Sequence, residues 1–502
     1  MAEMNQGRVD VLLTHSYHLY YDRKQALRQQ PYPPLGTMYV AALAREAGFS
    51  VALFDTMIEE PEEAFDRALA EYQPRVLLIC EDSFNFLSKM CLSRMREVSF
   101  SMQRRAAEAG IPAFVHGSDS TDQVQAYLAQ GFDAVLLGEC ERTFVELLHA
   151  VLRSGETAKW KIPGMAYLDD PDGKVVSTGS REPLVDLDRY PMPARDLISV
   201  ERYADIWKTH HGRASMNLVA SRGCPFHCNW CAKPIYGNRF VLRPAESVAE
   251  EMQILKHSYG VEHLWFADDI FALNRHWMQD FAAAVEQRDA ALPFKIQSRA
   301  DLMSAETVKA LARAGCEEVW MGAESGSQTI LNAMDKGLTV GAIRTASERL
   351  RSAGIRVCFF LQFGYPGETL AEIEETIALV RDCRPDDIGV SVSYPLPGTV
   401  FYQRVHEQLG VKRNWVDSGD LTAMFRAAYT DEFYRSLRDA LHYEVRQYAE
   451  PFSRESEARA AELWSDVYRK EQRCRNVMPT QLPILPSVET EHLSMCAEGS
   501  CR

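Results

Sequence analysis

Short apolar runs alternate with amphipathic stretches over the first 150 residues of the chain. The apolar runs have the length of buried strands, and they lie at 9–13, 50–54, 76–79, 112–115 and 134–137. Between them apolar residues recur every three or four positions, which predicts helices over 37–47, 61–72, 90–109 and 122–130. Strands that alternate with helices form a parallel sheet with helices on both faces. Residues 1–150 are therefore predicted to form a doubly wound α/β domain of the flavodoxin or Rossmann-like kind.

The same alternation returns between residue 213 and about residue 410. Six runs read as strands, at 217–220, 263–267, 294–298, 318–323, 356–362 and 388–394. Amphipathic stretches such as 245–257 and 369–382 lie between them and predict helices. Parallel strands that are joined by helices curl into a barrel, and six units predict a partial (β/α)6 barrel. In such barrels the residues that do chemistry lie at the carboxyl ends of the strands.

The remaining segments are predicted to connect, cover or extend these two domains. Residues 151–212 form a linker, in which apolar runs on either side of Asp-Asp-Pro-Asp-Gly predict a small hairpin and two later prolines exclude a regular helix. Residues 411–478 are predicted to be helical and to cap the barrel mouth, with helices over 418–429, 432–447 and 454–474. Proline and polar residues dominate 479–502, which we expect to be disordered.

Composition and charge narrow the classes of function. Of the 502 residues, 46% are hydrophobic and 25% are charged, as in ordinary soluble globular proteins. The net charge of −15 results from 55 basic and 70 acidic side chains, and it argues against nonspecific nucleic-acid binding. We expect no membrane span and no signal peptide, because no apolar run is long enough and the start lacks the pattern. Twelve cysteines without an export signal indicate a reducing, cytoplasmic setting in which thiols serve metal chemistry.

Three cysteines stand together after the first strand of the predicted barrel, in the sequence Ser-Arg-Gly-Cys-Pro-Phe-His-Cys-Asn-Trp-Cys. The spacing C-x3-C-x2-C places Cys224, Cys228 and Cys231 in one short loop, and Gly223 allows a tight turn ahead of it. Three thiolates leave one iron of a [4Fe–4S] cluster without a protein ligand, so that this iron can bind a small molecule. Zinc is an alternative, but no second pair of ligands follows at zinc-finger distance. Ordinary buried cysteines are another alternative.

This loop resembles the cluster-binding motif of the radical S-adenosylmethionine (SAM) enzymes, and the resemblance extends over nearly the whole chain. It implies that the free iron binds the amino and carboxylate groups of SAM. One electron from the reduced cluster then breaks a sulfur–carbon bond, which releases methionine and a 5′-deoxyadenosyl radical that takes a hydrogen from an unreactive carbon. An electron donor such as flavodoxin or ferredoxin is implied as a partner. The protein supplies positioning and excludes water and oxygen.

By the same resemblance, polar residues at the other strand ends suit a SAM site. Asp268 and Asp269 stand where the family binds the amino group, and Arg299 where a cation can neutralise the carboxylate. Glu324 and Ser325 can hydrogen-bond the ribose or the amino group, and a glycine turn at 364–368 resembles the loop on the adenine side. Each of these residues can instead belong to a helix cap or a solvated turn. The residues assigned to SAM are Asp268, Asp269, Arg299, Glu324, Ser325, Gly364 and Gly367.

The first domain resembles the cobalamin-binding domain that precedes the radical domain in one branch of these enzymes. The similarity lies in Tyr-Pro-Pro-Leu-Gly at 32–36, the turn at 116–119 and Gly-Glu-Cys-Glu-Arg-Thr at 138–143. Small residues at such turns let the backbone approach the corrin or its nucleotide tail. Ser118 and Cys140 stand where the family usually has glycine, and the motif Asp-x-His-x-x-Gly is missing from the sequence. A domain that kept the fold without the cofactor is the alternative. The residues assigned to cobalamin are Gly36, Gly117, Ser118, Gly138 and Glu139, while His15, His18 and His116 are either near cobalt or surface histidines.

These resemblances together imply a cobalamin-dependent radical SAM enzyme, and a C-methyltransferase that acts on an unactivated carbon is the leading expectation. An anaerobic oxidative cyclase, or another radical rearrangement enzyme of the same domain order, is the alternative within chemistry. A cobalamin or iron–sulfur sensor without turnover is the alternative from another class. The sequence leaves the substrate open among peptides, polyketide-like products, porphyrins and lipids.

Overall fold

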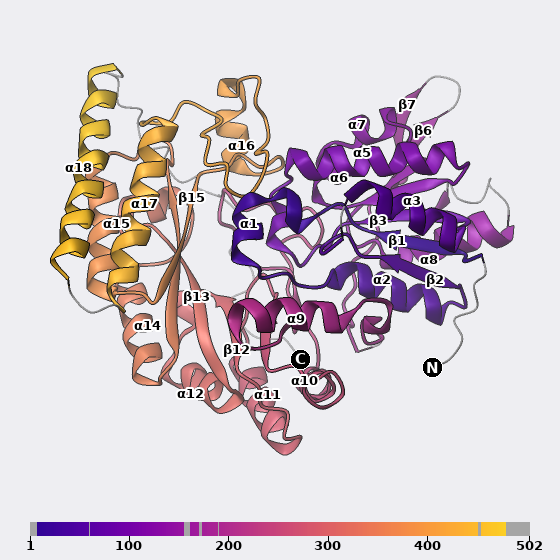
Figure 1. Ribbon diagram of the computed structural model, residues 1–502, viewed down its shortest axis with the longest axis horizontal. Helices are drawn as coiled ribbons and strands as arrows, with labels where there is room; N and C mark the ends of the chain where they lie inside the picture. Colours follow the sequence, from indigo (N-terminus) through magenta and orange to yellow (C-terminus); the bar gives the residue numbers. More distant parts are fainter. Residues whose placement is uncertain are drawn as a thin grey trace, which may run out of the picture.

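The computed structural model describes residues 8–59, 61–154, 161–169, 173–188, 190–449 and 453–477, and it contains two large sheets (Figure 1). The first sheet, in indigo and purple, lies beside the second, which is in red and orange. The tail predicted over 479–502 and parts of the predicted linker fall outside the described residues. Within the described ranges, every helix is too short or too polar to cross a membrane.

The first sheet has the strand order β2-β1-β3-β4-β5-β6-β7, and its first five strands are parallel. The order 2-1-3-4-5 is that of the flavodoxin-like fold, which confirms the predicted doubly wound domain. The five strands are β1 (Val11–Thr14), β2 (Val51–Phe54), β3 (Val76–Cys80), β4 (Ala113–His116) and β5 (Ala134–Leu136). The helices are α1 (Arg23–Arg28), α2 (Leu35–Glu46), α3 (Pro61–Tyr72), α4 (Phe86–Lys89), α5 (Ser93–Glu108), α6 (Ser118–Asp122), α7 (Val124–Ala129) and α8 (Glu141–His149).

Two separate cores cover the two faces of this sheet. Apolar residues of α2 and α8 pack on one face, and those of α3, α5 and α7 pack on the other. The helix predicted over 90–109 begins later, at Ser93, because Cys91 takes a left-handed backbone (φ 52°) and separates α4 from α5. The helix predicted over 122–130 corresponds to α7, and the short helix α6 precedes it.

The hairpin predicted in the linker exists, and it extends the first sheet. Its strands are β6 (Met165–Asp169) and β7 (Lys174–Ser177), which pair antiparallel with each other. β6 also pairs antiparallel with β5, through Met165 and Ala166. The sheet of the first domain therefore continues beyond residue 150.

The second sheet has six parallel strands in the order β15-β14-β13-β12-β11-β8, with edges at β15 and β8. This arrangement confirms the predicted partial (β/α)6 barrel. The strands are β8 (Ser215–Leu218), β11 (His263–Phe266), β12 (Phe294–Ser298), β13 (Cys316–Glu324), β14 (Arg356–Phe363) and β15 (Asp387–Val392). The helices are α9 (Val200–His211), α10 (Ala245–Ser258), α11 (Arg275–Gln287), α12 (Ala305–Ala314), α13 (Gln328–Ala333), α14 (Val340–Ser352), α15 (Leu370–Cys383) and α16 (Val400–Val405).

The strands are held against their helices by a core rich in aromatic residues. Phe266 of β11 lies 5.0 Å, between ring centroids, from Phe294 of β12 and 5.8 Å from Phe281 of α11. All three side chains are fully buried, and each such burial stabilises the fold by roughly 1.5–3 kcal/mol. This packing fixes the strand ends, and thus the loops that follow them.

The carboxyl-terminal region contains two long helices, α17 (Asp431–Gln447) and α18 (Arg454–Val477). α17 packs beside the edge strand β15 and α18 packs against α17, at the left of Figure 1. The helix predicted over 418–429 is wrong: these residues form turns. Asp417 and Asp420 accept hydrogen bonds from nearby backbone N–H groups, including those of Gly419 and Thr422, and such bonds compete with a helix.

Residues 415–420, at the start of this irregular segment, contact both domains. The side chain of Asp22, which caps α1, accepts hydrogen bonds from the Ser418 backbone N (3.1 Å) and hydroxyl (2.8 Å). The ring of Trp415 contacts that of Tyr394, just after β15, at a tilted angle of 34° and a centroid distance of 4.2 Å. The Trp415 carbonyl accepts a hydrogen bond from the backbone N–H of Ser93 at the start of α5. The segment therefore lies between the end of β15 and the first domain.

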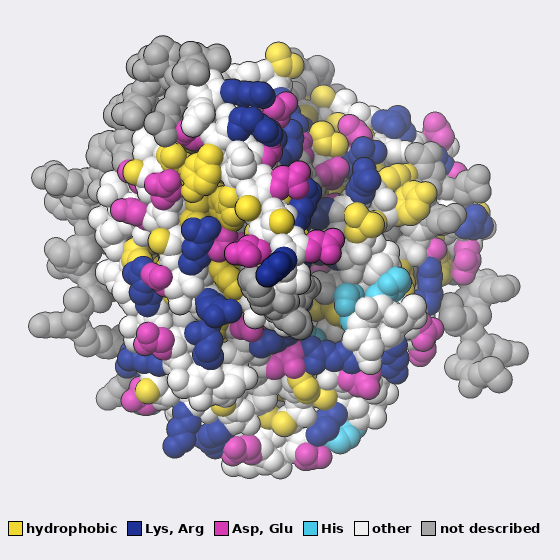
Figure 2. All heavy atoms as spheres, turned by 60° about the vertical axis from the view of Figure 1, so that its left-hand side comes forward, with side chains coloured by type: hydrophobic (Ala, Val, Ile, Leu, Met, Phe, Trp, Pro, Cys, Tyr) yellow, Lys and Arg dark blue, Asp and Glu magenta, His cyan; other side chains and the backbone are white. Residues whose placement is uncertain are grey.

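Acidic and basic side chains are interspersed on the face shown in Figure 2.

Candidate active site

The cysteine loop leaves the barrel at the carboxyl end of β8, as predicted. It begins after a two-residue strand, β9 (Ser221–Arg222), which pairs antiparallel with β10 (Val241–Leu242). Gly223 follows with φ 77°, and a Cβ atom there would overlap the carbonyl oxygen of Arg239. The turn ahead of the first cysteine thus requires glycine for its backbone angle and for space.

Replacing Gly223 by alanine is expected to displace the loop and to lower the iron content of the purified protein severalfold. The Cβ atom meets backbone, which cannot rotate away, and the left-handed angle adds roughly 1–3 kcal/mol of strain. Gly237→Ala is the matched control, because Gly237 has φ 66° but only a side-chain atom of Arg239 at 4.0 Å. Iron analysis and absorbance after anaerobic reconstitution measure the effect. Equal iron in the two variants would contradict the steric argument.

Asn229 anchors the middle of the cysteine loop to the barrel. Its side chain donates hydrogen bonds to the Ala333 carbonyl (2.7 Å) and to the carboxylate of Asp335 (2.9 Å). Its backbone N donates to the Met334 carbonyl (3.0 Å), and its carbonyl accepts from Phe401 (2.9 Å). The loop is held at the ends of α13 and α16, so the cysteines on either side of Asn229 have a fixed support.

The three thiols of the loop are free and partly exposed. Burial raises the pKa of Cys224, and it raises that of Cys231 to about 12, although Lys233 opposes this shift at both. Burial therefore disfavours the thiolates of Cys224 and Cys231, and a positively charged iron–sulfur core would stabilise them. Free thiols on one anchored loop fit the three-ligand set of a [4Fe–4S] cluster.

The two aspartates after β11 point in different directions. Asp268 is buried, and it accepts hydrogen bonds from the backbone N of Ala220 (3.1 Å) and the hydroxyl of Ser221. Burial raises the pKa of Asp268 to about 7. Asp269 is partly exposed and forms an ion pair with Lys89 at the end of α4. Asp268 thus supports the start of the loop, whereas Asp269 faces the first domain.

Arg299 contacts the cysteine loop directly. Its guanidinium lies 3.8 Å from the ring centroid of Phe226, between the first two cysteines. It also donates to both carboxylate oxygens of Asp301 (3.0 and 2.9 Å) and to the Lys336 carbonyl (2.8 Å). Its charge is therefore already balanced within the protein, and its position beside Phe226 helps to hold the loop.

Glu324 and Ser325 are buried at the end of β13. Glu324 accepts a hydrogen bond from the Lys336 ammonium (2.8 Å), and both side chains are almost inaccessible. Ser325 shares a hydrogen bond with the hydroxyl of Thr376 on α15 (3.1 Å). Lys336 was not singled out from the sequence, because it follows Glu324 by 12 positions and no local pattern indicates the pair.

The glycine turn after β14 is stabilised by Glu368. The Gly364 N–H donates to its carboxylate (2.6 Å), and Gly364 and Gly367 both have positive φ angles, 74° and 87°. Glu368 is fully buried, and its Oε1 has no hydrogen-bond partner among the described residues. Burial raises the pKa of Glu368 to about 8, so that this side chain is mostly protonated at neutral pH.

Replacing Glu368 by glutamine is expected to abolish the decrease in the free energy of unfolding that Glu368 causes as the pH rises. Because the pKa of Glu368 is above 4.5 in the folded protein, the folded state holds a proton that the unfolded state has released. The contribution of Glu368 to the free energy of unfolding is fully present below about pH 4.5. It is lost as the pH rises to about 8, and the loss is on the order of a few kcal/mol. Glutamine keeps the neutral shape, so the variant should match the wild type at pH 5 and exceed it at pH 8. Urea titrations at both pH values measure this, and parallel pH profiles would exclude it.

Two of the glycines assigned to cobalamin follow strands of the first sheet, and the third lies in the first turn of a helix. Gly117 follows β4, and a Cβ atom there would lie 2.8 Å from Cγ of Glu81, which follows β3. Gly138 follows β5 with φ 64°. Gly36, in the first turn of α2, donates its N–H to Asp82 (2.9 Å). These glycines lie at the edge of the sheet where doubly wound domains bind ligands, and the contact with Glu81 shows that packing within the domain already requires a small residue at Gly117.

Ser118 and Glu139 take up different positions at this edge. Ser118 is buried at the start of α6. Glu139 accepts a hydrogen bond from the Leu184 N–H (3.1 Å) and forms an ion pair with Arg239 (3.2 Å). Glu139 thus connects the first domain to the linker and to the segment after the cysteine loop.

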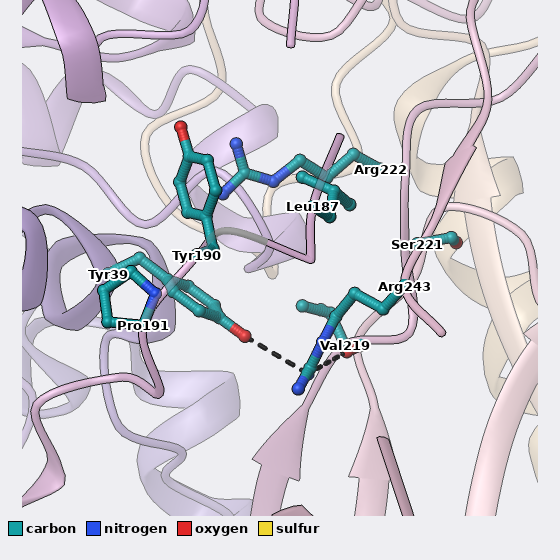
Figure 3. Close-up of a pocket in the computed structure, with 8 residues that line it drawn as sticks. All are labelled: Tyr39, Leu187, Tyr190, Pro191, Val219, Ser221, Arg222 and Arg243. Atoms are coloured by element: carbon teal, nitrogen blue, oxygen red, sulfur yellow. Dashed lines mark hydrogen bonds between the residues drawn. The ribbon is translucent and has the colours of Figure 1, made fainter. Parts of the chain in front are cut away.

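Arg222, next to the cysteine loop, is the residue at the domain boundary that sequence reasoning missed. It forms a buried ion pair with Glu141 at the start of α8 (2.7 Å). Its guanidinium also lies 4.8 Å from the ring centroid of Tyr190 and 5.5 Å from that of Tyr236. In Figure 3 its side chain reaches toward Tyr190, at a small cleft between the two domains. The contact couples the first domain to the cysteine loop.

Comparisons with known proteins match both domains. The model of the Radical SAM superfamily matches residues 218–380, and that of the B12 binding domain matches residues 26–148. An uncharacterized methyltransferase of Pyrococcus horikoshii is 28% identical over 395 residues, which cover 76% of this chain and 81% of that protein. An anaerobic magnesium-protoporphyrin IX monomethyl ester cyclase of Rubrivivax gelatinosus is 25% identical over 385 residues, covering 76% and 67%. The structure of the cobalamin-dependent SAM radical enzyme OxsB is similar to this one, with a TM-score of 0.68 and 15% sequence identity. The alignment covers 94% of this chain and 72% of that chain, and it supports the fold.

Proposed function

Because the chain belongs to the radical SAM enzymes that carry an amino-terminal B12-binding domain, we propose that it methylates an unactivated carbon of a small-molecule or peptide substrate. The cofactors are a [4Fe–4S] cluster, SAM and cobalamin. The similarity to a protein named as a methyltransferase, over most of both chains, supports methyl transfer as the reaction.

The observation that carries this proposal is the meeting of two sets of strand ends. The cysteine loop follows β8 of the barrel, and the turns around Gly117 and Gly138 follow β4 and β5 of the first sheet. Two ion pairs connect these edges: Arg222 with Glu141, and Lys89 with Asp269. A substrate between the two edges would face both cofactor sites and be shielded from solvent.

When bound, the cofactors supply a 5′-deoxyadenosyl radical from SAM and a methyl group from cobalt. In the proposal, Cys224, Cys228 and Cys231 hold the cluster on the anchored loop. Asp269 pairs with Lys89, and its negative charge also raises the pKa of Cys224 and of Cys231, which supports a place for it near the cluster loop and the SAM amino group. The other residues assigned to SAM line the same barrel edge, while Asp268, Arg299 and the Glu324–Lys336 pair already have protein partners. For these we propose positioning roles.

Oxidative cyclisation is the second candidate reaction. It is favoured by the similarity to the R. gelatinosus cyclase, over 76% of this chain. The mass of the product separates the two reactions, because methyl transfer adds a methylene group whereas cyclisation removes hydrogen or inserts oxygen.

A small electron-transfer protein such as flavodoxin or ferredoxin is part of the proposal, because the cluster has to receive one electron at a time. A reducing, cytoplasmic setting is also part of it. The ten described cysteines are all free thiols, and seven of them are buried, which supports a protein that folds without disulfides.

The test is anaerobic turnover with defined components. Reconstituted protein with cobalamin, a chemical reductant and SAM is expected to release 5′-deoxyadenosine, and cobalamin absorbance is expected to stay with the protein after desalting. Omitting the reductant is the control. Cobalamin retention without 5′-deoxyadenosine would support a sensor, and protein that ignores added cobalamin would remove methyl transfer from the proposal.

A further inference from the structure

Three metal-ligating side chains meet beneath the strand ends of the first sheet. Cys80 ends β3, His116 ends β4, and Cys140 precedes α8 as its N-cap. One ligand atom from each lies within 4.8 Å of the others, and each residue is at most 3% exposed. The sulfur of Cys80 lies 3.7 Å from Nδ1 of His116. Two ligands of one tetrahedral zinc ion, at about 2.3 Å for sulfur and about 2.0 Å for nitrogen, are about 3.5 Å apart.

The second ring nitrogen of His116 is already occupied. Nε2 lies 2.9 Å from the carbonyl oxygen of Gly138 and donates its proton to it. The lone pair of the neutral ring is therefore on Nδ1, on the side of the sulfurs. A backbone carbonyl that fixes the tautomer in this way is the usual support of a metal-bound histidine.

Burial also favours a metal ion at this place. Each of the three side chains is at most 3% exposed, so a thiolate here has no water to stabilise its charge and needs a cation instead. The positive end of α8, where Cys140 is the N-cap, supplies only part of this charge.

We propose that Cys80, His116 and Cys140 bind a zinc ion that ties the ends of β3, β4 and α8 together. Two thiolates and a neutral imidazole balance the two positive charges of zinc, and soft sulfur ligands suit it. Binding releases two thiol protons and involves no change of oxidation state. Three protein ligands leave the fourth position to water or to an added donor. The site is separate from the cysteine loop and goes beyond the proposed function.

Metal analysis of the full chain tests this site. Protein produced with added zinc and then desalted is expected to retain about one zinc per chain, and Cys80→Ser or Cys140→Ser to reduce this to the buffer background. Cys358→Ser is the matched control, because Cys358 is a buried free thiol of β14. The same zinc content is expected when Cys224, Cys228 and Cys231 are all alanine, which separates this site from the cluster loop.

Two measurements on the wild type make the test independent of how well the variants fold. The zinc X-ray absorption spectrum is expected to show sulfur and nitrogen neighbours. Adding zinc to chelator-stripped protein is expected to raise the unfolding temperature by several degrees. Zinc below about a tenth of an ion per chain, zinc that persists in Cys80→Ser, or a Cys80–Cys140 disulfide without zinc would each overturn the proposal. None of these results bears on cleavage of SAM by the cluster loop.

Discussion

Replacing Cys228 by alanine is expected to abolish the iron–sulfur chromophore and the reductive cleavage of SAM. Cys228 is the middle of the three free thiols of the loop, directly before the anchor Asn229. Without it, two thiolates remain for a cluster that needs three, because the fourth iron has to stay open for SAM. The iron content should fall from about four ions per chain to near zero. Iron analysis, absorbance and 5′-deoxyadenosine release measure the result.

Cys358→Ala is the control for this experiment. It removes a thiol of the same barrel that is fully buried in β14 and lies outside the cysteine loop, so the chromophore and SAM cleavage should survive. The outcome that contradicts the cluster assignment is an unchanged chromophore in Cys228→Ala. Anaerobically prepared wild-type protein with zinc instead of iron in the loop would contradict it as well.

Arg222→Ala is expected to lower the free energy of unfolding by about 3–5 kcal/mol. The guanidinium is about 4% exposed and pairs with the equally buried Glu141, so its removal leaves an acidic side chain without its partner. The aromatic rings of Tyr190 and Tyr236 also lose their cation. Since Arg222 joins the first domain to the start of the cysteine loop, the two domains should unfold less cooperatively. Urea denaturation followed by circular dichroism measures both effects.

The double variant Arg222→Ala with Glu141→Gln is expected to recover part of this loss, because no unpaired charge is left. Arg313→Ala is the exposed control. Arg313 pairs with Glu286 at 2.7 Å on the surface, where solvent screens such pairs and their loss has little effect on stability. A loss of less than about 1 kcal/mol for Arg222→Ala would show that the buried pair does not hold the domains together.

The periodicity of the chain predicted most of the architecture. The parallel strands of the first sheet and the six parallel strands of the second follow from the regular alternation of short apolar runs and amphipathic helices, whereas the order of the strands comes from the structure. The cysteine loop was placed correctly at a strand end, since its spacing is a local property of the sequence. The predictions over 432–447 and 454–474 correspond to α17 and α18. In each case the signal lies within about twenty consecutive residues.

Predictions from the local sequence were wrong where side chains form hydrogen bonds that compete with those of a helix backbone. The stretch 418–429 has the apolar content of a helix, but Asp417 and Asp420 bind neighbouring backbone N–H groups and keep it in turns. The aspartates after β11 looked equivalent in the sequence. Only the fold turns Asp268 inward to the backbone of Ala220 and Asp269 outward to Lys89.

The sequence by itself determined the α/β architecture, the cysteine loop at a strand end and the family resemblance, because hydrophobic period and ligand spacing are encoded over short distances. Only the tertiary structure decided which polar side chains are already paired, as in Arg222 with Glu141 and Lys336 with Glu324. It alone brought Cys80, His116 and Cys140 together, from the ends of β3 and β4 and the start of α8, which are far apart in the chain. The physical reason is that parallel strands align their carboxyl ends at one edge, so residues separated by whole helices become neighbours.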